Sequence, residues 1–214
     1  MNRRDFSMQL AGAGLGLATA GTAGAQGTPE EGKHYVRLQT AAQVTLPPQK
    51  KVEVIEFFWY GCPHCFAFEP TIEAWSKRLP ADVHFRQMPF AFIGPVEHQK
   101  LFYALEELGQ REGLQRKLFN AIHVESKRLN TEAEITAFVA ANGVDGAKFT
   151  EAFRSFAVNT KISRGKQVSN AYKIDGVPAI GINGRYFTSI TLAGSPEKAI
   201  AVTEFLIQRA RAGT

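Results

Sequence analysis

Cysteine is scarce in this chain, since only two of its 214 residues are cysteines. Both lie in one tetrapeptide, Cys62-Pro63-His64-Cys65. So few cysteines exclude a small scaffold held together by several disulfides, and they exclude a zinc site built from four thiolates. The fold must therefore be stable without a second cysteine pair, and any thiol chemistry is confined to this tetrapeptide.

Dense runs of basic residues are also missing. The 25 Lys and Arg outnumber the 20 Asp and Glu, which gives a net charge of +5, but they are scattered. Past the N-terminus the densest run is Gln49-Lys50-Lys51, far short of the clusters of about five to eight that indicate nucleic-acid binding. We therefore expect no nucleic-acid partner. The composition is 44% hydrophobic and 21% charged. This composition supplies a core and excludes a disordered chain.

Residues 1–25 have the pattern of an export signal. Arg3 and Arg4 form a short positive segment, an Ala/Gly/Leu stretch follows, and Ala23-Gly24-Ala25 matches a cleavage site before Gln26. The stretch is too poor in large apolar residues for a stable membrane span. The signal predicts an exported protein, in an oxidising compartment where cysteines have redox roles.

Two export routes fit this segment. Arg3-Arg4 followed by Asp5-Phe6 resembles a twin-arginine signal, and the low hydrophobicity of the stretch suits that route. A general secretion signal that happens to contain two arginines is the alternative. Both routes lead to the same compartment.

The tetrapeptide lies between a predicted buried strand and a predicted helix. Val52 to Tyr60 is β-branched and aromatic without Gly or Pro, which predicts a strand, and Gly61 breaks it. Apolar residues then recur at spacings of three and four, which predicts one buried helix face. The residues on that face are Cys65, Phe68, Ile72, Trp75 and Leu79.

The remaining elements suggest a sheet interrupted by helices. Helical periodicity dominates residues 95–173, where we expect four or five helices. A βαβ half and a ββα half can share one sheet with this block inserted between them, which predicts an α/β fold. The other predicted elements are strands at His34–Leu38, Val83–Pro89, Ala179–Ile182 and Arg185–Phe187, a turn at Asn183-Gly184, and a final helix capped by Ser195.

The spacing of Cys62 and Cys65 suits reversible disulfide formation. Side chains three residues apart on a helix lie about 5–6 Å apart at Cβ, close to what a disulfide needs. Cys62 is at the helix start, where free N–H groups and the helix dipole favour a thiolate. Cys65 is on the apolar face, so we expect it to be buried and to act as the resolving thiol.

The flanking residues predict the direction of the redox reaction. Pro63 suits the first helical turn, and His64 adds a donor or a positive charge beside Cys62. Interactions that stabilise a thiolate exist only in the reduced form, so they favour reduction of the pair and make the protein an oxidant. A metal-binding cysteine pair and a structural disulfide are the alternatives, although a bridge closing so short a loop stabilises little.

Further short motifs accompany the tetrapeptide. Glu56-Phe57-Phe58 precedes it and Gly176-Val177-Pro178 follows far downstream, with Gly32-Lys33-His34-Tyr35 and Asn183-Gly184 near the ends. On these residues the sequence resembles the DsbA family of periplasmic thiol oxidases. The resemblance implies a thioredoxin-like fold with an inserted all-helical subdomain. The thioredoxin-like domain would comprise residues 26–94 and 174–214, and the insert with its connecting helix residues 95–173.

The resemblance also implies a substrate site and partners. It implies a cis bond before Pro178, opposite the cysteines, with Gly176 and the Val177 backbone available to an extended substrate chain. Phe66 is a candidate for an apolar substrate groove, as are Phe90, Phe92 and Ile93, with core packing as the alternative for each. The expected partners are reduced, newly exported proteins and a membrane quinone-linked oxidase of the DsbB type. No organic cofactor or metal is expected, and the protein should be a monomer.

Two acidic residues are candidates for a role beside the cysteine pair. By strand alternation Glu56 shares a face with Val52, Val54 and Phe58, so its carboxyl should be buried and could exchange a proton with Cys65. The alternative is a carboxylate that is paired with a cation and serves only the fold. Relatives often place a lysine opposite this acid, where we expect Arg86-Gln87 here. Glu69 either tunes the thiolate or is an exposed helix charge, and His34, His84, His98 and His123 are expected at the surface or in packing.

Two other functions remain as alternatives. A disulfide reductase or isomerase could use the same fold, although we see no dimerisation segment before Val52. A metal-binding or chaperone module, in which the cysteines hold an ion, belongs to a different class.

Overall fold

The computed structural model describes residues 27–213, so the predicted export signal and Gln26 lie outside the described residues. Within this range the chain forms a five-stranded sheet and eight helices. The elements follow the order β1 (Val36–Arg37), β2 (Val52–Phe58), α1 (Pro63–Ser76), β3 (Val83–Pro89), α2 (Val96–Glu107), α3 (Arg111–His123), α4 (Glu132–Ala141), α5 (Gly146–Arg154), α6 (Phe156–Tyr172), β4 (Ala179–Ile182), β5 (Tyr186–Ser189), α7 (Ile190–Ala193) and α8 (Pro196–Arg211).

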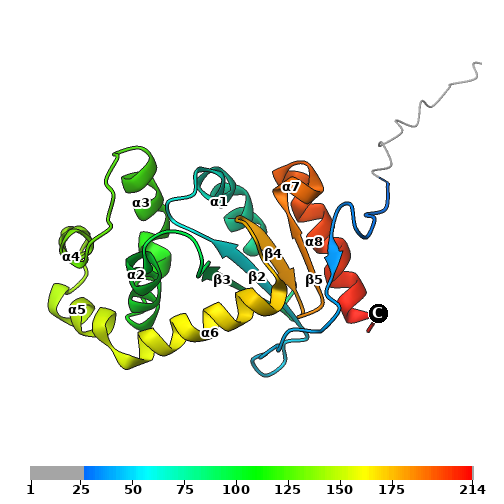
Figure 1. Ribbon diagram of the computed structural model, residues 1–214, viewed down its shortest axis with the longest axis horizontal. Helices are drawn as coiled ribbons and strands as arrows, with labels where there is room; N and C mark the ends of the chain where they lie inside the picture. The colour runs from blue at the N-terminus through cyan, green and yellow to red at the C-terminus, as the bar shows by residue number, and fades with distance from the viewer. Residues whose placement is uncertain (1–26, 214) are drawn as a thin grey trace, which may run out of the picture.

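The sheet has the order β1-β5-β4-β2-β3 (Figure 1). β2 and β3 are parallel and are joined through α1, while β4 is antiparallel to both β2 and β5. Asn183, Gly184 and Arg185 connect β4 to β5. Asn183 and Gly184 both have a positive φ, as the two central residues of a type I′ turn require. β2 is an internal strand between β4 and β3 and its seven residues are all buried, so the redox tetrapeptide follows a strand that is paired on both sides.

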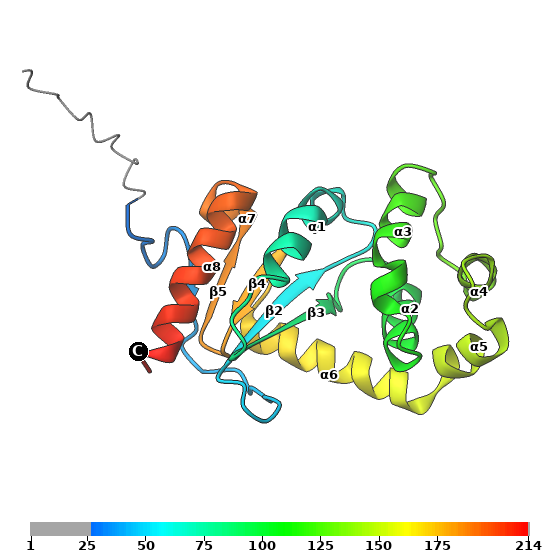
Figure 2. The same ribbon diagram turned by 180° about the vertical axis from the view of Figure 1, so that it is seen from behind.

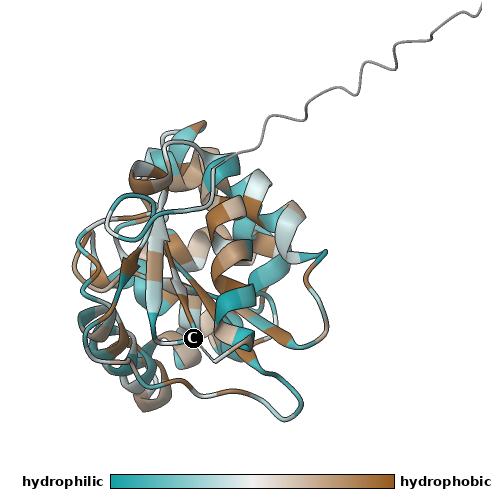
Figure 3. Ribbon diagram, turned by 90° about the vertical axis from the view of Figure 1, so that its right-hand side faces the viewer, coloured by the Kyte–Doolittle hydropathy of each residue, from teal (hydrophilic) through white to brown (hydrophobic). Residues whose placement is uncertain are grey.

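Helices cover both faces of the sheet. α1 and α8 pack on one face, and α6 passes across the other (Figures 1 and 2). Strand alternation divides β2 accordingly, with Val52 and Val54 in the core under α1 and α8, and Ile55 and Phe57 in the core under α6. The hydropathy colouring in Figure 3 shows hydrophobic and hydrophilic segments alternating along the helices, as expected of helices packed on one side only.

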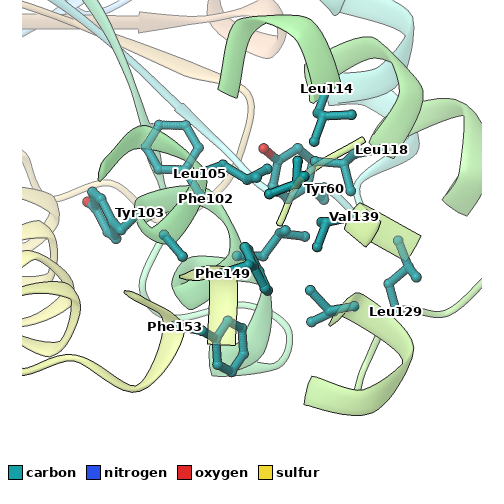
Figure 4. Close-up of a cluster of buried hydrophobic side chains, with 14 of the residues drawn as sticks. Tyr60, Phe102, Tyr103, Leu105, Leu114, Leu118, Leu129, Val139, Phe149 and Phe153 are labelled. Carbon is teal, nitrogen blue, oxygen red and sulfur yellow. The ribbon is translucent and has the colours of Figure 1, made fainter. Parts of the chain in front are cut away.

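The helices α2 to α5 form a second body beside the sheet, and α6 leads from it back to β4 (Figure 1). Their buried side chains form one cluster that includes Phe102, Leu118, Val139 and Phe149 (Figure 4). Ser155 caps the start of α6, and Lys173 ends that helix in the left-handed conformation. None of the helices in residues 27–213 is both long and apolar enough to span a membrane.

The structure differs from the sequence-based elements in small ways. α1 ends at Ser76, so Leu79 lies beyond the helix, although it still packs against the core. β5 begins at Tyr186 rather than Arg185, because Arg185 completes the hairpin turn by donating its backbone N–H to the Ile182 carbonyl. The one-turn helix α7 was not predicted, since four residues show no helical periodicity.

Candidate active site

Cys62 is the N-cap residue of α1 and follows closely on the end of β2. Its backbone is extended, and its Sγ accepts a hydrogen bond from the Cys65 N–H at 3.4 Å. Pro63 occupies the first helical turn, where its missing N–H removes no helix bond. Cys62 is 7% exposed and Cys65 is fully buried, an order of exposure that suits an attacking and a resolving thiol.

The two thiols have opposite electrostatic environments. Hydrogen bonding from the Cys65 thiol, then from the backbone N–H groups of Cys65 and His64, lowers the pKa of Cys62 to about 6, and the nearby His64 charge acts in the same direction. Burial, followed by hydrogen bonding with Cys62 and the Cys62 charge, raises the pKa of Cys65 far above its ordinary value. At neutral pH the reduced pair therefore holds a thiolate at Cys62 and a thiol at Cys65.

The loop before β4 lies against Cys62. The Val177–Pro178 peptide bond is cis, as the resemblance implied, and Cys62 Sγ lies 3.6 Å from the Val177 carbonyl oxygen, to which it can donate only as the protonated thiol. Pro178 is buried, while Gly176 and Val177 are half-buried. This geometry brings Val177 next to the sulfur that a substrate would reach.

Glu56 is buried within electrostatic reach of Cys65 and is linked to a second acid. The Gln87 amide donates to Glu56 Oε2 at 2.8 Å and to Glu69 Oε2 at 3.3 Å, while Glu56 Oε1 has no hydrogen-bond partner among the described residues. Burial, followed by the Glu69 charge, raises the pKa of Glu56 well above its ordinary value. The Glu56 charge in turn contributes to the raised pKa of Cys65, so ionisation of either group opposes ionisation of the other.

Strand register decides which of Arg86 and Gln87 meets Glu56. Gln87 is directly opposite Glu56, whereas Arg86 is opposite Ile55 and points to the other face. Arg86 therefore pairs with Glu53, with 3.0 Å between Arg86 Nε and Glu53 Oε1. The partner of Glu56 is a neutral amide, and that amide is held by a cation of α3, because Arg111 Nη1 donates to Gln87 Oε1 at 2.6 Å.

Glu69 is buried, so its interpretation as an exposed helix charge is wrong. It is only 6% exposed, because it faces β3 and α3 rather than solvent. Burial raises its pKa, and the nearby Gln115 and Gln87 side-chain amides partly oppose that rise. Glu69 also borders a cavity of about 410 Å³ between α1, β3 and α3, which Gln87 and Arg111 line as well.

The four groove candidates occupy different environments. Phe90 is 2% exposed and belongs to the core under α6, so its interpretation as packing is confirmed. Phe66 and Ile93 are half-buried, and Phe92 is 47% exposed with Lys166 above its ring. Phe66 is the one that adjoins the cysteines in sequence, and its ring stacks on His123.

Several residues near the site carried no signal in the sequence. Trp59 donates its indole N–H to His98 Nδ1 at 3.0 Å, and His98 Nε2 donates in turn to the Leu129 carbonyl at 3.1 Å. His98 is 2% exposed, so its interpretation as a packing residue holds. These contacts join the end of β2 to the helical body. Neither periodicity nor a motif predicts contacts between segments so distant in sequence.

The sheet order, the Cys-x-x-C tetrapeptide at the start of α1 and the cis-proline opposite it together define a thioredoxin-like thiol:disulfide oxidoreductase. Residues 96–197 match the model of the DSBA-like thioredoxin domain. The chain is 43% identical over 182 residues to the thiol:disulfide interchange protein DsbA of Pseudomonas aeruginosa, covering 85% of each chain. It is 41% identical over 215 residues to DsbA of Bordetella pertussis, covering 99% of this chain and all of that one.

Solved structures agree with the sequence relatives. The crystal structure of Pseudomonas aeruginosa DsbA matches with a TM-score of 0.81 at 43% identity, covering 85% of this chain and 94% of that one. That of Xylella fastidiosa DsbA matches with a TM-score of 0.78 at 28% identity, covering 86% and 98%. This chain belongs to the DsbA family. The predicted α/β fold, thioredoxin-like with an inserted helical subdomain, is confirmed.

Proposed function

We propose that this protein is a periplasmic dithiol oxidase, which donates a disulfide between Cys62 and Cys65 to newly exported proteins. The observation that supports this direction best is the asymmetry of the pair, with a stabilised thiolate at Cys62 and a buried thiol at Cys65. A disulfide carries no charge, so the hydrogen bonds around Cys62 stabilise the reduced form alone. The oxidised form is therefore a strong acceptor of electrons.

The reaction consists of two thiol–disulfide exchanges. A substrate thiolate attacks Cys62 Sγ, which is more exposed than Cys65; the Cys62–Cys65 bond breaks and Cys65 leaves with the electron pair. A second substrate thiolate then attacks the substrate sulfur of the mixed disulfide, and Cys62 leaves as a stable thiolate. The substrate loses two electrons and two protons in total, and the cysteine pair gains two electrons.

Glu56 supplies the proton that Cys65 needs. The buried Cys65 cannot remain a thiolate, because burial favours its neutral form. Glu56 is itself buried and favours its protonated form, so it gives a proton to Cys65 when the mixed disulfide forms. It takes the proton back when the pair is reoxidised.

The substrate chain binds beside the cis-proline. Val177 and Gly176 are half-buried next to Cys62, so an extended peptide can pair with their backbone as an added strand while the half-buried Phe66 offers apolar contact. His64, which is exposed at the start of α1, contributes to the thiolate environment. Backbone pairing suits reduced, unfolded exported proteins of many sequences.

Reoxidation completes the cycle. A membrane quinone-linked oxidase of the DsbB type accepts the two electrons from Cys62 and Cys65, and the protein acts as a monomer with no cofactor beyond its cysteine pair. Residues 1–25 direct export before this cycle begins, by the twin-arginine or the general route.

The redox equilibrium with glutathione tests the oxidase against the reductase or isomerase. The purified protein is equilibrated with buffers of reduced and oxidised glutathione, and the reduced fraction is measured by alkylation and mass shift. A potential well above the roughly −270 mV of thioredoxin supports the oxidase, and a couple near that value contradicts it.

Metal analysis tests the metal-binding alternative. Among residues 27–213 no group of three or more His, Cys, Asp or Glu is arranged to hold an ion. Protein purified without chelator should oxidise a dithiol peptide. Stoichiometric zinc or copper without that activity would favour a metal-binding or chaperone module.

A further inference from the structure

The segment between β2 and Cys62 is a tight turn. The Cys62 N–H donates to the Trp59 carbonyl at 3.0 Å, so residues 59–62 form a β-turn with Tyr60 and Gly61 at its centre. The two common turns, type I and type II, differ by a flip of the peptide between the two central residues. The flipped form, type II, needs a positive φ at the third residue of the turn, which glycine adopts readily. Gly61 is not among the glycines with positive φ, so the turn is in the unflipped form.

His123 holds the central peptide of this turn. The ring lies in the last turn of α3, and its Nε2 is 2.8 Å from the Tyr60 carbonyl oxygen. A carbonyl can only accept a hydrogen bond, so His123 Nε2 carries the proton and donates it. A flipped peptide would turn the Tyr60 oxygen away and leave this donor without its partner.

The same ring also contacts the chain after the cysteines. His123 stacks on Phe66 with 4.8 Å between ring centroids and 8° between planes. Phe66 follows Cys65 directly, and its backbone N–H donates to the Cys62 carbonyl at 3.0 Å. One side chain of the helical insert therefore contacts both flanks of the tetrapeptide.

A second contact from α3 holds the same tyrosine. The Tyr60 hydroxyl donates to Gln115 Oε1 at 2.8 Å, and the Tyr60 ring is buried in the cluster of the helical body (Figure 4). With Gln115 fixing the side chain and His123 the carbonyl, rotation of the Tyr60–Gly61 peptide is opposed by one rigid helix.

We propose that His123 is a positioning residue for the redox centre. Its hydrogen bond keeps the Tyr60–Gly61 peptide in one of the two orientations open to the turn, and thereby maintains the N-cap geometry in which Cys62 Sγ receives its hydrogen bonds. The helical insert thus contributes directly to the stability of the Cys62 thiolate. This inference rests on the proposed function of Cys62 as the reactive thiolate.

Two substitutions separate the hydrogen bond from packing. His123→Phe keeps an aromatic ring against Phe66 and removes the donor, whereas His123→Gln keeps an N–H donor at a similar reach. The Cys62 pKa is measured on reduced protein from thiolate absorbance in the far ultraviolet against pH. We expect His123→Phe to raise it by about one unit and His123→Gln to restore most of that change. At pH 7 a one-unit rise makes the pair about fivefold less oxidising against glutathione.

The controls distinguish the possible failures. His84→Phe changes a half-buried histidine of β3 that lies opposite Glu53 in the sheet and should leave the Cys62 pKa unchanged. If His123→Phe does not fold, His123→Asn replaces it, because the shorter amide cannot reach Tyr60. An unchanged Cys62 pKa in the folded donor-deficient variant overturns the role of His123. An ordinary Cys62 pKa in the unsubstituted protein overturns the proposed function instead.

Discussion

Replacing Cys62 by serine in the reduced protein removes a group whose ionisation should stabilise the fold near neutral pH. The structure lowers the pKa of Cys62 from 9.0 to about 6. When folding lowers the pKa of an acid, the ionised acid stabilises the folded state. The whole of this stabilisation is present above the pKa of the unfolded state, and it is lost as the pH falls to the pKa of the folded state. The reduced wild type should therefore gain stability over Cys62→Ser between pH 6 and pH 9.

The size of the effect follows from the same shift. Three pKa units correspond to at most about 4 kcal/mol above pH 9, at about 1.4 kcal/mol per unit. Linkage leaves about 1.4 kcal/mol of this at pH 7 and about 2.7 kcal/mol at pH 8, while almost nothing remains at pH 5. Solvent screening at the partly open sulfur lowers these upper bounds.

Urea unfolding with excess reductant measures this difference directly. The free energies of unfolding of the wild type and Cys62→Ser are determined at pH 5 and pH 8, and the change in their difference cancels the titrating groups that do not interact with Cys62. We expect the wild type to gain about 1–3 kcal/mol relative to the variant over this range. A difference that stays constant within about 0.5 kcal/mol would refute the thiolate argument.

Three further predictions concern the buried acid and the fold. The folded structure raises the pKa of Glu56, so the ionised carboxylate destabilises the fold as the pH rises above the unfolded pKa. In urea unfolding, Glu56→Gln should therefore be more stable than the wild type at pH 8 and equally stable near pH 4. In stopped-flow assays the same variant should transfer disulfides more slowly. Gly181→Ala should destabilise the protein by about 1–3 kcal/mol in thermal unfolding, because its Cβ would lie 2.5 Å from the Tyr172 ring. Gly113→Ala, in the open on α3, should instead stabilise it by about 0.5–1 kcal/mol, and equal effects of the two changes would contradict the packing argument. Thr131→Ala should cost about 1 kcal/mol by chemical denaturation, since the capping box of α4 loses its hydroxyl, and Thr131→Ser should restore most of it.

Elements that depend on short local sequence patterns were predicted correctly. The strand Val83–Pro89, the strand Ala179–Ile182 and the Ser195 cap occur at the predicted residues, because periodicity and turn chemistry act over only a few residues. The boundary at Ser76 was missed, since the apolar repeat continues to Leu79 after the helix hydrogen bonds have ended.

The partner of Glu56 needed the strand register. Arg86 and Gln87 are adjacent in sequence and could each have faced the acid, yet they point to opposite faces of β3. A shift of one residue would have given Glu56 a cation and a much lower pKa. Glu69 likewise reads as an ordinary helix charge until β3 and α3 bury it.

The reactive pair and its polarity can be predicted from the order of residues alone. A Cys-x-x-C at a strand–helix junction puts Cys62 at a helix N-terminus and Cys65 on the buried face, and both follow from helix geometry. The surroundings of the pair required the packed structure: the Val177 carbonyl, the Glu56–Gln87–Glu69 network and the His123 contact with Tyr60. Distance along the chain explains this division, because His123 is 63 residues from Tyr60 and Val177 is 115 from Cys62, and only the packing of the sheet and the helical insert brings them together.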